Sequence, residues 1–132
     1  MKELRAETST QKLYWDSDNQ IVWGELFGNL VTEEVAKENI DAQERLRDGL
    51  NKARTRVLID MTGITEISKE ARDYFANERT ASIQRATALL IGSPVSRVIG
   101  NFFMGLNKPI SPTRLFTDPS TAIRWLHTFS DD

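Results

Sequence analysis

Two short apolar runs, each followed closely by a helix start, constrain the fold more than any other feature of the chain. Residues 56–61 and 86–91 are rich in aliphatic and β-branched side chains. Their length and composition predict strands that are buried on both faces of a sheet. Ser68 and the pair Ser93-Pro94 then supply the capping hydroxyls, and in the second case a proline, with which helices begin. Strands that alternate with helices predict parallel strands joined by right-handed crossovers.

Residues 11–27 predict an antiparallel hairpin ahead of these units. Residues 13–15 and 21–27 are rich in β-branched and aromatic side chains, and a run of turn formers at residues 16–19 separates them. Gly28 and Asn29 break the second strand. Residues 1–10 carry no predicted element, and we expect them to be flexible.

The remaining elements complete one domain over residues 1–132. Thr32 caps a helix that ends near Gly49, residues 114–117 form a short strand, and Asp118-Pro119 begins a last helix. We therefore predict an α/β fold with a mixed sheet of about five strands and about four helices. An antiparallel N-terminal hairpin precedes the parallel strands of this sheet.

Composition and charge exclude several classes of function. The chain has 132 residues, and its 17 basic and 19 acidic residues are interspersed, which argues against a nucleic-acid partner. It has no cysteine, which excludes disulfides and cysteine-ligated zinc and suits a reducing compartment such as the cytoplasm. We find no signal peptide and no apolar stretch long enough to span a membrane. His127 is the only histidine, so we expect no metal site and no cofactor.

The order of the predicted elements and the stretch Val-Leu-Ile-Asp-Met-Thr-Gly-Ile-Thr-Glu-Ile-Ser at residues 57–68 resemble the STAS domain. This domain is the fold of bacterial anti-sigma-factor antagonists and of the cytoplasmic part of sulfate transporters. The similarity extends to uncharacterised bacterial proteins grouped as SpoIIAA-like and SEC14-like. The resemblance implies a regulatory module that binds a protein partner.

In the antagonists, a strand that ends in Asp-Leu leads to Asp-Ser-Ser-Gly at the next helix start, where a partner kinase phosphorylates a serine. When Asp60-Met61 is aligned with the Asp-Leu pair, the tetrad falls on residues 68–71 of this chain. Glu70 then occupies the acceptor position, Ala71 replaces the glycine, and Ser68 replaces the preceding acid. We therefore expect an interaction edge here that lacks the phosphoacceptor motif.

The loop after Asp60 and the start of the next helix form the predicted partner-binding edge, because loops at the carboxyl ends of parallel strands are exposed. The candidate residues are Asp60, Thr65, Glu66, Ser68, Lys69, Glu70 and Arg72. Asp60, Ser68, Glu70 and Arg72 also have ordinary structural explanations. Asp60 can accept hydrogen bonds from its own loop between Gly63 and Thr65, and Ser68 can simply cap the helix.

Two weaker candidates lie further along the chain. Ser93, Ser96 and Arg97 can hold an anion at a helix N-terminus, although an ordinary helix start is the favoured explanation, because the glycines of a phosphate loop are absent. Phe102, Phe103 and Met104 are three large apolar residues in a row, at the end of an apolar stripe that begins at Val95. A helix cannot turn all three toward a sheet, so they predict a surface for self-association or for an apolar ligand.

Two functions follow from these candidates. The first is the interaction module, which binds a protein partner or a second copy of the chain. The second is a carrier or sensor of a small apolar or lipid-like ligand, and several aromatic residues outside clear core positions support it. These residues are Trp15, Trp23, Phe27, Tyr74 and Phe103. We find no nucleophile–base pair, metal cluster or phosphate loop, and we therefore expect no enzymatic activity.

Overall fold

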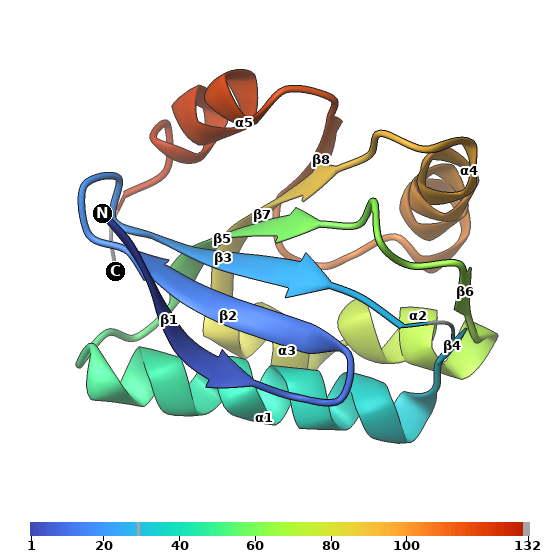
Figure 1. Cartoon of the computed structure of the whole chain (residues 1–132), viewed down its shortest axis with the longest axis horizontal. Coiled ribbons are helices and arrows are strands. Elements are labelled where there is room, and N and C mark those ends of the chain that lie inside the picture. Colours follow the sequence, from blue (N-terminus) through green and yellow to red (C-terminus); the bar gives the residue numbers. More distant parts are fainter. Residues whose placement is uncertain (29, 131–132) are drawn as a thin grey trace.

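A computed structural model describes residues 1–28 and 30–130, and its centre is a mixed β-sheet (Figure 1). Within the described residues the sheet has six strands in the order β1-β2-β3-β5-β7-β8. Their bounds are β1 (Lys2–Glu7), β2 (Gln11–Asp16), β3 (Ile21–Leu26), β5 (Thr55–Asp60), β7 (Gln84–Leu90) and β8 (Thr113–Phe116). The strands β1 to β3 pair antiparallel, and the pairings from β3 onward are parallel. The predicted hairpin followed by parallel strands is therefore confirmed.

Helices cover both faces of the sheet. The described residues form α1 (Glu33–Gly49), α2 (Lys69–Phe75), α3 (Glu78–Ile83), α4 (Pro94–Phe102), the π-helix η1 (Phe103–Asn107) and α5 (Pro119–Leu126). Buried side chains of α1, α2 and η1 share one core cluster with the sheet, whereas those of α5 belong to a second cluster on the other face. Figure 1 shows α5 above the sheet and α1 to α3 below it.

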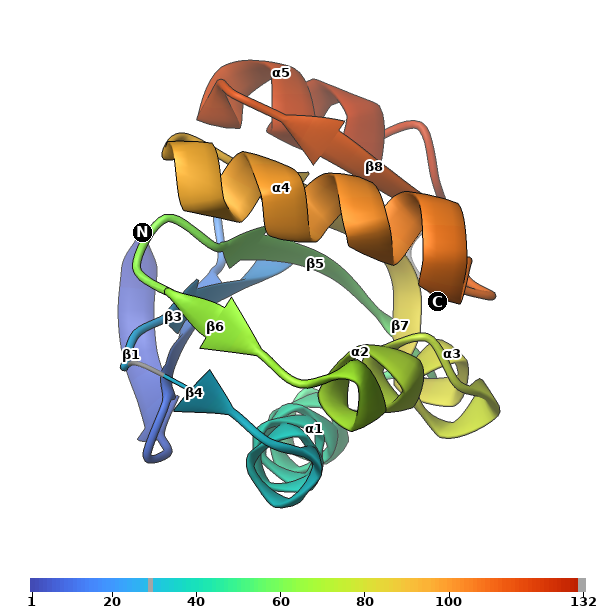
Figure 2. The same cartoon turned by 90° about the vertical axis from the view of Figure 1, so that its right-hand side faces the viewer.

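A small second sheet closes one end of the molecule. It pairs β4 (Leu30–Val31) with β6 (Glu66–Ile67) in parallel. Figure 2 shows this end, where β4, β6, α2 and α4 all face the viewer. The loop after β5 therefore leaves the main sheet, adds one short strand, and then enters α2.

Local sequence explains where the helices begin. Thr32, Ser68, Asn77, Ser93 and Asp118 are the N-caps, and each side chain accepts a hydrogen bond from a backbone N–H of the first turn. Proline follows two of these caps, at the first position of α4 and of α5. The predicted starts at Thr32, Ser68, Ser93 and Asp118 are confirmed, and Asn77 adds the start of α3, which we did not predict.

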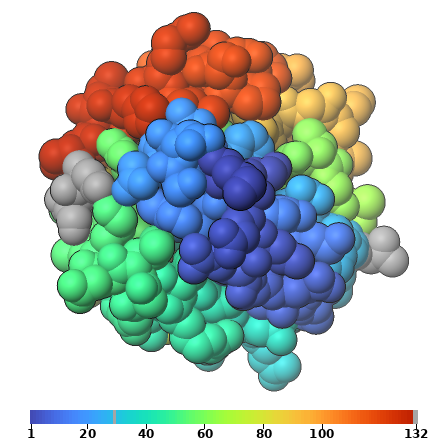
Figure 3. All heavy atoms as spheres, turned by 60° about the vertical axis from the view of Figure 1, so that its left-hand side comes forward, coloured from blue at the N-terminus to red at the C-terminus, as the bar shows by residue number. Residues whose placement is uncertain are grey.

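The first strand is the main difference from the predicted fold. Residues 1–10, expected to be flexible, include β1, which pairs with β2 along the edge of the sheet. Figure 3 shows this N-terminal segment on the face that lies between α1 and the C-terminal segment. Most side chains of β1 are exposed, so main-chain hydrogen bonds hold it rather than an apolar face. Gly28 follows β3 with a positive φ of 95°, and Asn29 lies outside the described residues.

Candidate functional site

The carboxylate of Asp60 closes the turn that leaves β5. Its Oδ1 accepts hydrogen bonds from the backbone N–H of Thr62 at 2.9 Å and from the hydroxyl of Thr62 at 2.7 Å. Thr62, in the loop that follows β5, thus provides donors to Asp60. In this structure Asp60 shapes the loop.

Gly63 lets the same loop press against the end of β3. A Cβ atom at this position would lie 2.5 Å from the backbone oxygen of Leu26. Ile64, the next residue, is 1% exposed and belongs to the core. The loop after β5 is consequently fixed at Gly63 and Ile64, and the residues beyond Ile64 return to the surface.

Most of the predicted interaction edge is exposed. The side chains of Thr65, Glu66, Lys69 and Glu70 lie on the surface between β6 and the first turn of α2. Lys69 pairs with Asp73 at 2.8 Å, and this hydrogen bond raises the pKa of Lys69 and lowers the pKa of the Asp73 carboxyl. These residues therefore form a charged rim beside α2.

Two residues of the predicted edge have structural contacts instead. Ser68 is half-buried, and its hydroxyl accepts a hydrogen bond from the N–H of Ala71 at 3.1 Å as the cap of α2. Arg72 is also half-buried, and its Nε donates to Oδ1 of Asn107 at 3.1 Å. Asn107 in turn donates through Nδ2 to Oδ1 of Asp73 at 2.6 Å. Arg72, Asn107 and Asp73 thus connect α2 to η1.

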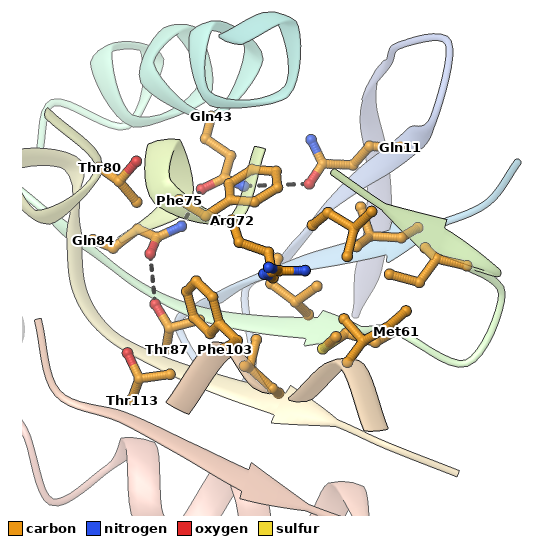
Figure 4. Close-up of a pocket in the computed structure, with 16 residues that line it drawn as sticks. Gln11, Gln43, Met61, Arg72, Phe75, Thr80, Gln84, Thr87, Phe103 and Thr113 are labelled. Carbon is orange, nitrogen blue, oxygen red and sulfur yellow. Dashed lines mark hydrogen bonds between the residues drawn. The ribbon is translucent and has the colours of Figure 1, made fainter. Parts of the chain in front are cut away.

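The guanidinium of Arg72 points into a cavity between the sheet and the helices (Figure 4). The cavity has a volume of about 60 Å³. Most of its wall is apolar and comes from the sheet, α2, α4 and η1. The apolar lining residues are Leu26, Ile59, Met61, Ile64, Ile67, Phe75, Leu89, Ile99 and Phe103.

A chain of buried amides forms the polar part of the wall, and Figure 4 shows its hydrogen bonds as dashed lines. Gln43 of α1 donates through Nε2 to Oε1 of Gln11 at 3.2 Å, and Gln84 of β7 donates to Oε1 of Gln43 at 2.8 Å. The hydroxyl of Thr87 donates to Oε1 of Gln84 at 2.7 Å, and Gln11 donates to the carbonyl of Asn39 at 3.3 Å. We call Gln11, Gln43, Gln84 and Thr87 the amide ladder.

Neither the cavity nor the amide ladder was predicted from the sequence. One signal was present, because Gln43 lies three residues after Ile40 on the buried side of α1, where an apolar residue is expected. Gln11 and Gln84 gave no comparable signal, since each is the first residue of its strand.

The two serines of the predicted anion site hydrogen-bond to each other and to the local backbone. The Ser93 hydroxyl accepts a hydrogen bond from the N–H of Ser96 at 3.1 Å, and the buried Ser96 hydroxyl accepts from the N–H groups of Gly92 and Ser93 at 3.1 and 3.0 Å. The two serines therefore satisfy each other as a capping box. Arg97 is exposed and lines an open hollow of about 380 Å³ together with Asp118, whose negative charge opposes the binding of an anion.

The apolar stripe of α4 divides between two sides of the helix. Phe103 is 9% exposed and lines the cavity with Ile99, and Met104 is half-buried. Phe102 is 50% exposed. Three other residues of the expected stripe also lie outside, namely Val95, Val98 and Leu106. An apolar ridge therefore remains on the outer side of α4 and η1.

The aromatic residues do not line one common pocket. Trp15 is buried in the core, and Trp23 lies on the other face of the sheet beneath the Lys2 ammonium, 4.3 Å from its ring centroid. Tyr74 accepts a hydrogen bond through its hydroxyl from Arg79, and Phe27 is half-buried beyond β3. Among the five aromatics singled out from the sequence, Phe103 lines the cavity.

Ionisable side chains of the described residues show no metal site, since no three or more His, Asp or Glu side chains come together in a group that could hold an ion. His127 is exposed at the end of α5, and its Nε2 lies 2.8 Å from the carbonyl oxygen of Asn19. In the same part of the chain, no helix has the length and apolar character required to cross a membrane.

Comparison with solved structures shows which fold this is. An uncharacterised protein of the DUF3478 family with a SpoIIAA-like fold, from Shewanella loihica PV-4, has 15% identity and a TM-score of 0.59 over 96% of this chain and 95% of that chain. The anti-sigma factor antagonist SpoIIAA in its unphosphorylated form has 12% identity and a TM-score of 0.50, over 96% and 98% of the respective chains. The protein thus has a STAS-like fold of the SpoIIAA type, as the sequence resemblance predicts.

Its family is also defined. The chain belongs to the family described as a domain of unknown function, DUF7793, whose model matches residues 14–130. None of the curated proteins matches the chain.

Proposed function

We propose that this protein is a non-catalytic, STAS-like regulatory module that works by binding a protein partner. The observation that carries the proposal is the distribution of exposed apolar side chains. Four of the eight large apolar side chains that are exposed among the described residues lie on one segment, α4 and η1. They are Val95, Val98, Phe102 and Leu106. Clustered apolar surface of this kind marks interaction sites in soluble domains.

The apolar ridge adjoins the charged rim at the start of α2. Figure 2 shows α4 crossing in front of the sheet, with β6 and α2 directly below it. Contacts between α4 and β6 and between α2 and η1 hold these elements together. We call Val98, Phe102 and Leu106, together with Glu66 and Glu70, the α4 face. An apolar centre with a polar rim is the usual arrangement of a protein–protein interface.

We propose that binding at the α4 face does not depend on phosphorylation. The STAS resemblance implies that Glu70 occupies the acceptor position, and its exposed carboxylate supplies about one of the nearly two negative charges of a phosphate. Ser68 is the neighbouring hydroxyl of the aligned tetrad, and it caps α2. A phosphate on Ser68 would disturb this cap.

The candidate polar side chains already make local structural hydrogen bonds, and this supports binding rather than catalysis. Asp60 closes its turn, Ser93 and Ser96 form a capping box, and His127 lies at the end of α5 beside Asn19. We propose the cytoplasm as the location, because the absence of cysteine suits a reducing compartment.

Two substitutions on the α4 face test the proposal. Glu70→Lys reverses the charge of the rim, and Phe102→Glu places a charge in the apolar ridge. Both side chains are exposed, so each change should alter the free energy of unfolding by no more than about 0.5 kcal/mol. We expect each variant, used as bait in extract of the source cells, to lose the same crosslinked protein that the unmodified chain retains.

Matched controls lie on β1, at another edge of the sheet. Glu7→Lys and Leu4→Glu make the same kinds of change at exposed positions, and both variants should retain the partner. Sedimentation of the isolated protein would separate self-association from capture of a different protein. If Glu70→Lys and Phe102→Glu both retain every crosslinked protein while remaining folded, the α4 face is not the binding surface.

A further inference from the structure

Arg72 is the one charged side chain that the described residues contribute to the wall of the cavity, and the Asp73 carboxylate, whose pKa the charge of Arg72 helps to lower, stands outside that wall. The cavity is lined by apolar side chains, by the amide ladder, by the hydroxyls of Thr80 and Thr113, and by Arg72, so no Asp or Glu of the described residues takes part in its wall. Among these residues Arg72 forms one hydrogen bond, through Nε to Asn107. Its two terminal nitrogens thus keep their N–H groups available on the side that Figure 4 shows facing the cavity.

We propose that this cavity binds a small carboxylate with a short aliphatic body, whose anionic end pairs with Arg72. A guanidinium held through Nε presents its two terminal nitrogens as a fork that matches the two oxygens of a carboxylate. Asn107 holds Arg72 in this way, and Asp73 in turn accepts a hydrogen bond from Asn107. The site is consequently preorganised before a ligand arrives.

The size and the wall of the cavity select the ligand. Its volume of about 60 Å³ corresponds to about four to six water-sized groups. Side chains such as Met61, Phe75 and Phe103 surround most of this space, so an aliphatic body gains more from entering it than a polar one does. Arg72 is half-buried and therefore reaches the surface, where a charged group can enter without complete loss of water. Butyrate, with its carboxylate and three further carbons, has the required size and character.

The cavity adjoins the α4 face, which makes carboxylate binding relevant to regulation. The carboxylate proposal nevertheless does not require the α4 face. Phe103 of η1 lines the cavity, whereas its neighbour Phe102 lies outside on the ridge. A π-helix such as η1 is a common feature of functional sites. The cavity can bind a carboxylate even if the α4 face binds no protein, and the two proposals fail in separate experiments.

The test is a titration of the isotope-labelled protein with butyrate, followed by nuclear magnetic resonance. We expect saturable shifts of the Arg72 Nε–H signal and of the side-chain amide signals of Gln43 and Gln84. Butyramide, which has the same shape and no charge, should bind at least about tenfold more weakly, because it lacks the charge-assisted pair. Butylammonium should not bind.

Variants locate the binding in the cavity. Arg72→Gln should weaken butyrate binding at least about tenfold, Arg72→Lys should retain part of it, and Arg45→Gln, at an exposed position on α1, should leave it unchanged. Leu89→Phe, which reduces the space, should weaken binding without removing the charge. The proposal is overturned if butyrate causes no saturable shift, if butyramide binds equally well, or if folded Arg72→Gln and Arg72→Lys both bind butyrate as the unmodified chain does.

Discussion

At the scale of single residues, polar side chains in this protein mainly shape the backbone. Asp16 is an example, because its carboxylate holds the turn between β2 and β3. Oδ1 accepts the N–H groups of Asp18 and Asn19, both at 3.1 Å, and Oδ2 accepts the side-chain amide of Asn19 at 2.8 Å. Burial raises the pKa of this carboxyl, but the hydrogen bonds from Asn19 and Asp18 and the nearby N-terminal charge outweigh it, so the pKa lies below the ordinary 3.8.

Asp16→Ala should therefore destabilise the fold in a pH-dependent manner. At pH 7 we expect a loss of about 1 to 2 kcal/mol in the free energy of unfolding, because a charged acceptor of three hydrogen bonds is removed. A carboxyl whose pKa is lower in the folded state stabilises fully above the unfolded value, and this contribution disappears as the pH falls through the folded value. The difference between the two proteins should thus shrink below about pH 4. Urea unfolding at neutral and acid pH measures it, with Glu7→Ala as the control, and a difference independent of pH would contradict the assignment.

At the scale of elements, the sequence predicts helices and strands best where the buried residues follow a regular pattern. The strands β5 and β7 were recognisable because each is a short apolar run, and the starts of α2 and α4 because each has a capping serine. β1 was not recognisable, since its exposed and charged side chains carry no alternating pattern. The apolar pattern predicted the helix α4 correctly, but the periodicity of apolar residues does not indicate which side of the helix packs against the sheet. Ile99 and Phe103 turn inward, and Val98 and Phe102 remain outside.

The cavity could not be predicted for a different reason. Its polar wall joins Gln11, Gln43 and Gln84, which come from three elements far apart in the chain. Arg72 belongs to the predicted edge, but a surface arginine and one that points inward look the same in a sequence. The direction of Arg72 depends on its hydrogen bond to Asn107 of η1, and the helix that carries Arg72 follows the loop after β5.

Gly63 is the residue on which that loop depends. Gly63→Ala would bring a methyl group within 2.5 Å of a backbone oxygen of Leu26, and backbone cannot move aside as a side chain can. We expect a loss of about 2 kcal/mol, in the range of overpacked sites, together with displacement of the loop seen as changed amide signals at Thr65 and Glu66. Gly49→Ala is the matched control, because no atom lies within 4 Å of the added methyl group and the position is helical. It should be neutral or stabilising. Equal effects of the two substitutions would show that close approach at Gly63 is unimportant.

At the scale of the whole molecule, two of the hydrogen-bonded connections between elements that are distant in sequence lie beside the cavity. The amide ladder joins β2, α1 and β7, and the bridge through Asn107 joins α2 to η1. Both border the cavity, the ladder directly and the bridge through Arg72. A buried polar network is costly unless all its members are paired. The ladder therefore predicts strong coupling between its residues.

Gln43→Leu tests this coupling, because Gln43 is 3% exposed and stands in the middle of the ladder. The substitution leaves Oε1 of Gln11 and Nε2 of Gln84 without their partner, and we expect a loss of about 3 kcal/mol in the free energy of unfolding. Gln84→Leu breaks the same bond from the other side. Since both substitutions remove one shared interaction, the double variant should lose less than the sum of the single losses, by about 1 kcal/mol.

Arg45→Leu, on the exposed side of α1, should change stability by less than about 0.5 kcal/mol. Urea unfolding of the four variants gives the coupling directly, and strict additivity would mean that Gln43 and Gln84 act independently and that the ladder does not join α1 to β7.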